Sequence, residues 1–209
     1  MPREPAVRAT AERARLWCEA ILARSLDPRS LAFARGPVGA AVLDAIDETA
    51  ADLVVLGEGG LARYVARTTR RPLLVARAPR ETARILAFTD FSDPRFPVLR
   101  QAAALRREAG EVTFVGSRHR GTPAAQRARL MAGVAAEYAN VKVLVSDQRP
   151  TEQALLATAH LWGADLVAVP SHPQALLMRA GLGDLGCRVA ASATSSVLVV
   201  PVGPAAASA

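Results

Sequence analysis

Serine and histidine are the residue types in this chain that could carry chemistry, and their spacing argues against nucleophilic catalysis. No serine lies in a Gly-x-Ser-x-Gly turn, and no histidine–carboxylate pair is placed to activate one. His160 falls mid-helix beside Trp162, where a surface or half-buried position is expected. His172 follows an apolar run in a predicted exposed loop, so it is the histidine best placed to contact a ligand. The sequence therefore predicts a protein that is not an enzyme.

The sequence also lacks the patterns expected of a metal site or a dinucleotide-binding site. Cys18 and Cys187 are far apart and form no Cys-x-x-Cys pair, and three histidines are too few for a zinc cluster. Gly181-Leu182-Gly183 with Gly186 lacks the strand-to-helix junction of a dinucleotide fingerprint. We expect no metal and no required cofactor.

Composition narrows the class of partner. The chain has 209 residues, 51% of them apolar and 22% charged, which is typical of a soluble globular protein. Its formal charge is +7, but arginines occur in every segment and aromatics are only 4%, so nucleic acid is not the expected partner. No apolar run is long enough to span a membrane, and the N-terminal residues lack the apolar core of a signal peptide. A cytoplasmic location is expected.

An internal repeat organises the chain. Residues 163–170 (Gly-Ala-Asp-Leu-Val-Ala-Val-Pro) repeat residues 50–57 (Ala-Ala-Asp-Leu-Val-Val-Leu-Gly), and the match continues upstream without a gap to Pro150 and Pro37. Each copy leads into another short apolar run, at 197–200 and 73–76. A repeated unit of helix and buried strand predicts two related α/β units, with a boundary near residues 79–81.

Apolar periodicity places the elements that must position the candidate residues. Spacing of three and four predicts helices, and short continuous apolar runs predict buried strands. The predicted helices cover 6–23, 38–49, 97–109, 124–139, 151–162 and 185–191, with a short basic helix or loop at 61–70. The predicted strands cover 31–34, 52–56, 72–76, 85–88, 112–115, 141–145, 166–169 and 197–200. From residue 81 onward, five strands alternate with four helices, which indicates an open parallel five-stranded sheet with helices on both faces, a Rossmann-like α/β fold.

At these residues the chain resembles the universal stress protein family in its tandem form. The resemblance covers Arg84–Val202. It is carried by an apolar first strand that runs into Thr89-Asp90-Phe91-Ser92, by residues 164–167 (Ala-Asp-Leu-Val), and by a final Val-Leu-Val-Val-Pro. It implies a sheet with strand order third-second-first-fourth-fifth. Many members bind ATP through a Gly-x-x-Gly, nine residues, Gly-Ser/Thr loop after the fourth strand.

The loop that the resemblance aligns with this motif has lost most of it. Pro170 and Pro173 stand where the first two glycines are expected, and proline supplies no N–H to a phosphate. Gly183 is kept, but the residue after it is Asp184, whose carboxylate would repel a triphosphate. The resemblance therefore implies a vestigial nucleotide site at Thr89, Asp90, Val115, Ser171, His172, Gly183 and Asp184. Asp90 has a second interpretation, because an aspartate in this sequence also caps the following turn and helix.

The first unit departs from the family further. Gly57 and Gly60 keep the Gly-x-x-Gly spacing, but only residues 61–71 separate them from the next strand. Nothing before residue 6 matches the first strand, first helix and second strand, so residues 1–80 are expected to be an incomplete repeat and 81–209 a complete domain. Either the repeat is natively incomplete or the start of the chain is misassigned, and either the remaining strands close up or another chain fills the gap.

These observations lead to one expected function and one alternative. We expect a non-enzymatic stress-response interaction module with a degenerate nucleotide site and a protein partner or self-association. The alternative is a sensor that binds ATP or AMP weakly. The two units are expected to associate through their C-terminal strands.

Overall fold

The computed structural model describes residues 36–77, 83–89, 91, 93, 95–106, 110–116, 123–138, 141–145, 151–172 and 184–202. The chain divides into two compact units, Met1–Ala41 and Val42–Ala209, and the sheet described below belongs to the second. The predicted helix 6–23 and strand 31–34 lie outside the described residues. So do Asp90, Pro173 and Gly183.

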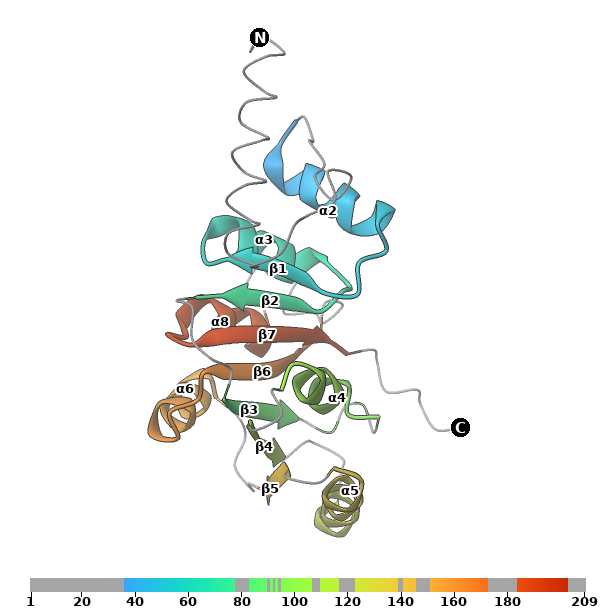
Figure 1. Ribbon diagram of the computed structural model, residues 1–209, viewed down its shortest axis with the longest axis vertical. Coiled ribbons are helices and arrows are strands. Elements are labelled where there is room, and N and C mark those ends of the chain that lie inside the picture. Colours follow the sequence, from blue (N-terminus) through green and yellow to red (C-terminus); the bar gives the residue numbers. More distant parts are fainter. Residues whose placement is uncertain are drawn as a thin grey trace. The chain divides into compact units, whose positions relative to one another are not determined.

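The described residues form one seven-stranded sheet in the order β1-β2-β7-β6-β3-β4-β5 (Figure 1). Its strands are β1 (Val54–Gly57), β2 (Leu73–Ala76), β3 (Arg84–Thr89), β4 (Glu111–Gly116), β5 (Val141–Val145), β6 (Leu166–Ser171) and β7 (Ser196–Pro201). The part β5-β4-β3-β6-β7 is parallel throughout and has the expected order third-second-first-fourth-fifth. The predicted α/β fold class is confirmed, and two further strands extend the five-stranded sheet.

Helices cover both faces of this sheet, as long apolar parallel strands require. Those with described bounds are α2 (Val38–Glu48), α3 (Gly60–Thr68), α4 (Pro97–Ala104), α5 (Ala124–Glu137), α6 (Glu152–Leu161) and α8 (Leu185–Ser192). Because strand side chains alternate between faces, Leu86 and Phe88 pack with α6 and α8, while Ile85 and Ala87 pack with α4 and α5. Figure 1 shows α4 and α8 on opposite sides of the sheet.

The strand β2 joins β7 in antiparallel fashion, with Val75 opposite Val197. This is the expected association of the two C-terminal strands. The Arg77 guanidinium supports the junction by donating to the carbonyls of Ser195 at 2.9 Å and Ala190 at 2.6 Å. Within the described residues β1 pairs only with β2, so β1 is an edge strand and Val55 on it is 56% exposed.

The two copies of the sequence repeat share a turn. Ala50 and Gly163 occupy matching positions, and their φ angles are +48° and +59°. In each copy the next residue donates its N–H to a carbonyl five residues back, from Ala51 to Ile46 and from Ala164 to Ala159. This is the Schellman ending of a helix, which favours glycine at the left-handed position.

Several element bounds differ from the prediction. The strand β6 continues to Ser171, so Pro170 lies inside the strand rather than in a loop. Pro170 lies beyond Ala168, the last residue of β6 that pairs with β3. A residue without an N–H is tolerated there, because fewer hydrogen bonds between strands are needed. The helix α4 ends at Ala104, five residues before the predicted end.

Candidate functional site

Three of the predicted site residues lie together where β6 meets α8. Ser171 ends β6 and is 1% exposed, His172 follows it, and Asp184 precedes α8. The Ser171 carbonyl accepts the N–H of Val202 at 2.8 Å, which ties the end of β6 to the end of β7. His172 is half-buried, so the expectation of an exposed loop histidine is wrong.

The Asp184 carboxylate occupies the N-terminus of α8. One oxygen accepts the N–H of Cys187 at 2.9 Å, and the other accepts the backbone N–H of His172. The side chain is buried, and its charge suits the positive end of the helix dipole. One amide of this helix end, that of Cys187, and the amide of His172 just after β6 are therefore hydrogen-bonded to the protein's own carboxylate.

A close backbone approach locks this junction. A Cβ on Gly186 would lie 2.6 Å from the carbonyl oxygen of Pro170, so only glycine lets the first turn of α8 rest on the end of β6. The sequence singles out Gly186 only as part of a weak glycine pattern. Its role here is packing, which spacing alone does not reveal.

Thr89 and Val115 do not join this cluster as a pair. Phe88 is opposite Val115 in the sheet and Thr89 is opposite Gly116, so the side chains of Thr89 and Val115 lie on opposite faces. The buried Thr89 hydroxyl accepts the N–H of Phe91 at 3.1 Å, which holds the turn after β3. The grouping of both residues around one ligand stays a prediction, and their side chains would approach that ligand from opposite faces of the sheet.

An aromatic cluster beside this turn is the feature that sequence reasoning missed. Phe91 has a left-handed φ of +59°, and its ring lies so close to Gly116 that a Cβ there would be 2.4 Å from it. Phe91 packs edge-on to Phe96 at 6.3 Å, and Phe96 packs edge-on to Phe114 at 5.5 Å between ring centroids. In the sequence, Gly116 at the end of β4 is the feature that could have indicated this close packing.

The Cys187 thiol is held in its neutral form. Burial raises the pKa of Cys187 to about 12, and the nearby Asp184 carboxylate acts in the same direction. The thiol donates to the Ala66 carbonyl at 3.5 Å, which connects α8 to α3. A thiol in this state is a packing group and a poor nucleophile.

Ligands for a metal do not converge in the described part of the chain. No group of three or more histidine, cysteine, aspartate or glutamate side chains there is arranged to hold an ion. His160 is exposed on α6 and stands apart from the junction. Of the helices in these same ranges, none has the length and apolarity needed to cross a membrane.

Comparison with known proteins decides the family. The model of the Universal stress protein family matches residues 81–201, which is more than half of the chain. The chain belongs to the universal stress protein family. No curated protein matches this universal stress protein significantly.

Solved structures share the fold of this universal stress protein. A universal stress protein from Archaeoglobus fulgidus DSM 4304 is 16% identical with a TM-score of 0.71, over 97% of this chain and 81% of that one. A functionally unknown protein from Pseudomonas aeruginosa PAO1 is 15% identical with a TM-score of 0.63, over 96% and 79%. A putative universal stress protein from Pseudomonas aeruginosa UCBPP-PA14 is 15% identical with a TM-score of 0.60, over the same shares. These likenesses establish the fold.

Proposed function

We propose that this universal stress protein is a non-enzymatic interaction module of the stress response, with a degenerate nucleotide site and a cytoplasmic location. One observation carries the proposal: the Asp184 carboxylate binds the amides of Cys187 and His172 at the start of α8. A helix N-terminus that binds phosphate needs free N–H donors and no competing negative charge. In this protein the Asp184 carboxylate occupies the position that a bound phosphate would take.

The neighbouring backbone supports the same proposal. Pro170 contributes no N–H, and its carbonyl lies against Gly186, so this position of β6 adds no donor to the helix amides. Because phosphate binding at this site is proposed to be weak, we propose that the protein binds a protein partner or a second copy of the chain instead. Among the strands that the structure describes, β1 pairs on one side only, and its outer edge is the proposed surface for such association.

Calorimetric titration of the purified protein with ATP and AMP tests the proposal. We expect no binding with a Kd below about 1 mM, and no turnover of ATP. Light scattering during size-exclusion chromatography would detect self-association. Micromolar binding of ATP or AMP to the unmodified protein would overturn the proposal in favour of a nucleotide sensor.

The variant Asp184→Ser tests the cause. A serine still caps α8 but removes the charge, so we expect ATP to bind at least about tenfold more tightly than to the unmodified protein. Asp44→Ser, which removes an exposed carboxylate of α2, is the matched control and should leave ATP binding unchanged. Equal ATP affinity in both variants would show that the Asp184 carboxylate is not what blocks the site.

A further inference from the structure

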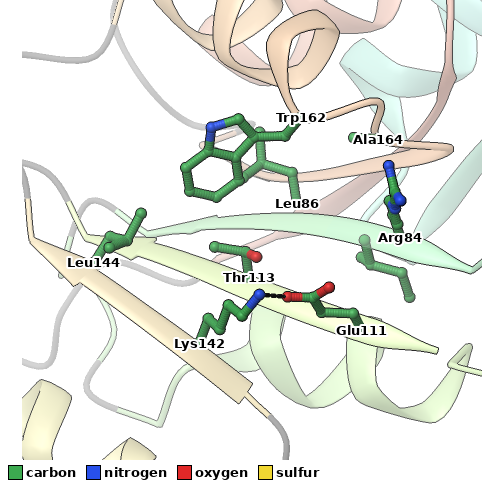
Figure 2. Close-up of a pocket in the computed structure, with 9 residues that line it drawn as sticks. Arg84, Leu86, Glu111, Thr113, Lys142, Leu144, Trp162 and Ala164 are labelled. Carbon is green, nitrogen blue, oxygen red and sulfur yellow. Dashed lines mark ion pairs between the residues drawn. The ribbon is translucent and has the colours of Figure 1, made fainter. Parts of the chain in front are cut away.

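A separate hollow opens on the face of the sheet that α6 covers. It has a volume of about 410 Å³ and lies over β3, β4 and β5, beside the end of α6 (Figure 2). Arg84 and Glu111 are the first residues of their strands, whereas Ser171 is the last residue of β6, His172 follows it and Asp184 precedes α8. The hollow is therefore at the opposite end of the parallel strands from the β6–α8 junction.

The walls of the hollow are mainly apolar. Leu86 forms part of the floor and is 1% exposed, and the side chains of Trp162 and Leu144 also line the hollow (Figure 2). Leu144 is 43% exposed, although it is a large aliphatic side chain in a strand. An apolar group seated here would remove Leu144 and the Trp162 indole from water, which is favourable.

Four polar side chains give the hollow a chemical preference. The Lys142 ammonium forms an ion pair with the Glu111 carboxylate, so these two charges offset each other. The Arg84 guanidinium has no carboxylate within salt-bridge distance among the described residues, and it lies close to Gly163. Thr113 is 7% exposed, and the described ranges contain no hydrogen-bond partner for its hydroxyl. One positive charge and one hydroxyl are thus left for a ligand.

We propose that this hollow binds a small organic carboxylate with an apolar body. Its carboxylate pairs with the Arg84 guanidinium, which presents two parallel N–H donors to such a group. Its body packs against Trp162, Leu86 and Leu144, and the Thr113 hydroxyl is available for a further hydrogen bond. The volume falls at the lower end of the range of about 300–1,000 Å³ for small-molecule pockets, which limits the ligand to one or two rings or a short chain.

Titration with 1-naphthoate and with its neutral analogue 1-naphthamide tests this assignment. The unmodified protein should bind naphthoate at one site with a Kd below about 1 mM, and more tightly than the amide. Arg84→Gln should weaken naphthoate binding by about tenfold or more and leave naphthamide binding unchanged. Arg70→Gln removes the same charge from another exposed position and should change neither.

A nuclear magnetic resonance readout locates the ligand. In a Trp17→Phe background Trp162 is the sole tryptophan, so its indole N–H resonance should shift as naphthoate is added. Absence of naphthoate binding, binding that Arg84→Gln does not weaken, or an unshifted Trp162 resonance would each overturn the proposal. Arg84 is exposed, and circular dichroism of Arg84→Gln checks that the variant is folded.

Discussion

At the scale of single residues, burial decides which reactive groups stay reactive. Cys187 is 6% exposed and faces the Ala66 carbonyl of a neighbouring helix, while the Asp184 carboxylate lies close by. Both surroundings disfavour a thiolate, since a charge is poorly solvated there and a second negative charge is near. The same carboxylate that caps α8 also helps to keep the thiol protonated.

Alkylation should therefore be slow at Cys187. In a Cys18→Ser background, we expect iodoacetamide at about pH 8 to modify the folded protein on the order of a thousandfold more slowly than the unfolded chain, because little thiolate is present. Mass spectrometry after timed quenching gives the rates. Equal rates in the folded and unfolded protein would contradict the raised pKa.

The raised pKa of Cys187 also predicts a dependence of stability on pH. The folded protein holds the thiol proton more tightly than the unfolded chain, so this contribution to the free energy of unfolding is complete below the ordinary value of 9.0 and declines as pH rises toward about 12. Urea unfolding measured at several values in this window should show a steeper loss for the unmodified protein than for Cys187→Ala. An equal loss of stability with pH in the unmodified protein and in Cys187→Ala would contradict the prediction.

At the scale of elements, helix ends and helix–strand junctions depend on single backbone positions. Ala50 and Gly163 end their helices with the same hydrogen bonds, although only one of them is glycine. An alanine at positive φ is strained, because its Cβ crowds the backbone. Ala50 thus keeps the turn at a cost in stability that Gly163 avoids.

Exchanging these two residue types should move stability in opposite directions. Ala50→Gly should raise the free energy of unfolding by about 0.5–1 kcal/mol, and Gly163→Ala should lower it by about 1 kcal/mol or more. Gly163→Ala also brings a Cβ to 3.2 Å from the Arg84 guanidinium. Urea unfolding of both variants is the measurement, and a loss of stability in Ala50→Gly would contradict the interpretation of the shared turn.

Gly186 allows a second comparison of glycines within helices. Gly186→Ala should destabilise the protein by roughly 1–3 kcal/mol, because the new Cβ meets the Pro170 carbonyl at 2.6 Å. Gly133→Ala in α5 is the matched control: a Cβ there meets nothing within 4 Å, and alanine should stabilise the helix by about 1 kcal/mol. Thermal melts that place both variants on the same side of the unmodified protein would refute this account.

At the scale of the whole molecule, the unit Val42–Ala209 is built around one continuous sheet rather than two separate ones. The antiparallel pairing of β2 with β7 joins the strands into this one sheet, and Arg77 stabilises the pairing. The Arg77 side chain is 8% exposed and binds two carbonyls at the end of α8 as well as Glu58. We propose that residues 1–80 are an incomplete repeat of the domain 81–209, and the shared helix ending at Ala50 and Gly163 supports this proposal.

A continuous sheet predicts one cooperative unfolding transition for this unit. In a Trp17→Phe background, urea transitions followed by far-ultraviolet circular dichroism and by Trp162 fluorescence should coincide. Arg77→Met should lower the stability by about 2–4 kcal/mol, because it leaves the partly buried carbonyls of Ser195 and Ala190 without a charged donor. Arg63→Met, at an exposed position of α3, should have little effect. Two separated transitions would show that β1 and β2 unfold independently of the rest.

Particular residues show which structural features could be predicted from the sequence and which could not. The apolar runs at 85–88, 112–115 and 166–169 predict their strands, because continuous burial on both faces leaves a local pattern in the chain. The family resemblance places Asp184 in the phosphate-binding loop, and its charge is the basis for predicting poor phosphate binding there. The two hydrogen bonds that Asp184 accepts were not predictable from the sequence, since they depend on how the end of β6 meets α8.

The sequence by itself determined the buried strands and the residues that carry the family resemblance, because these follow from residue types and local periodicity, and the resemblance in turn implied the strand order. Only the tertiary structure decided that Thr89 and Val115 lie on opposite faces, that Arg77 joins β2 to α8, and that Arg84 and Trp162 border one hollow. Those relations join residues far apart in the chain. They depend on strand register and on side-chain packing, which no local pattern encodes.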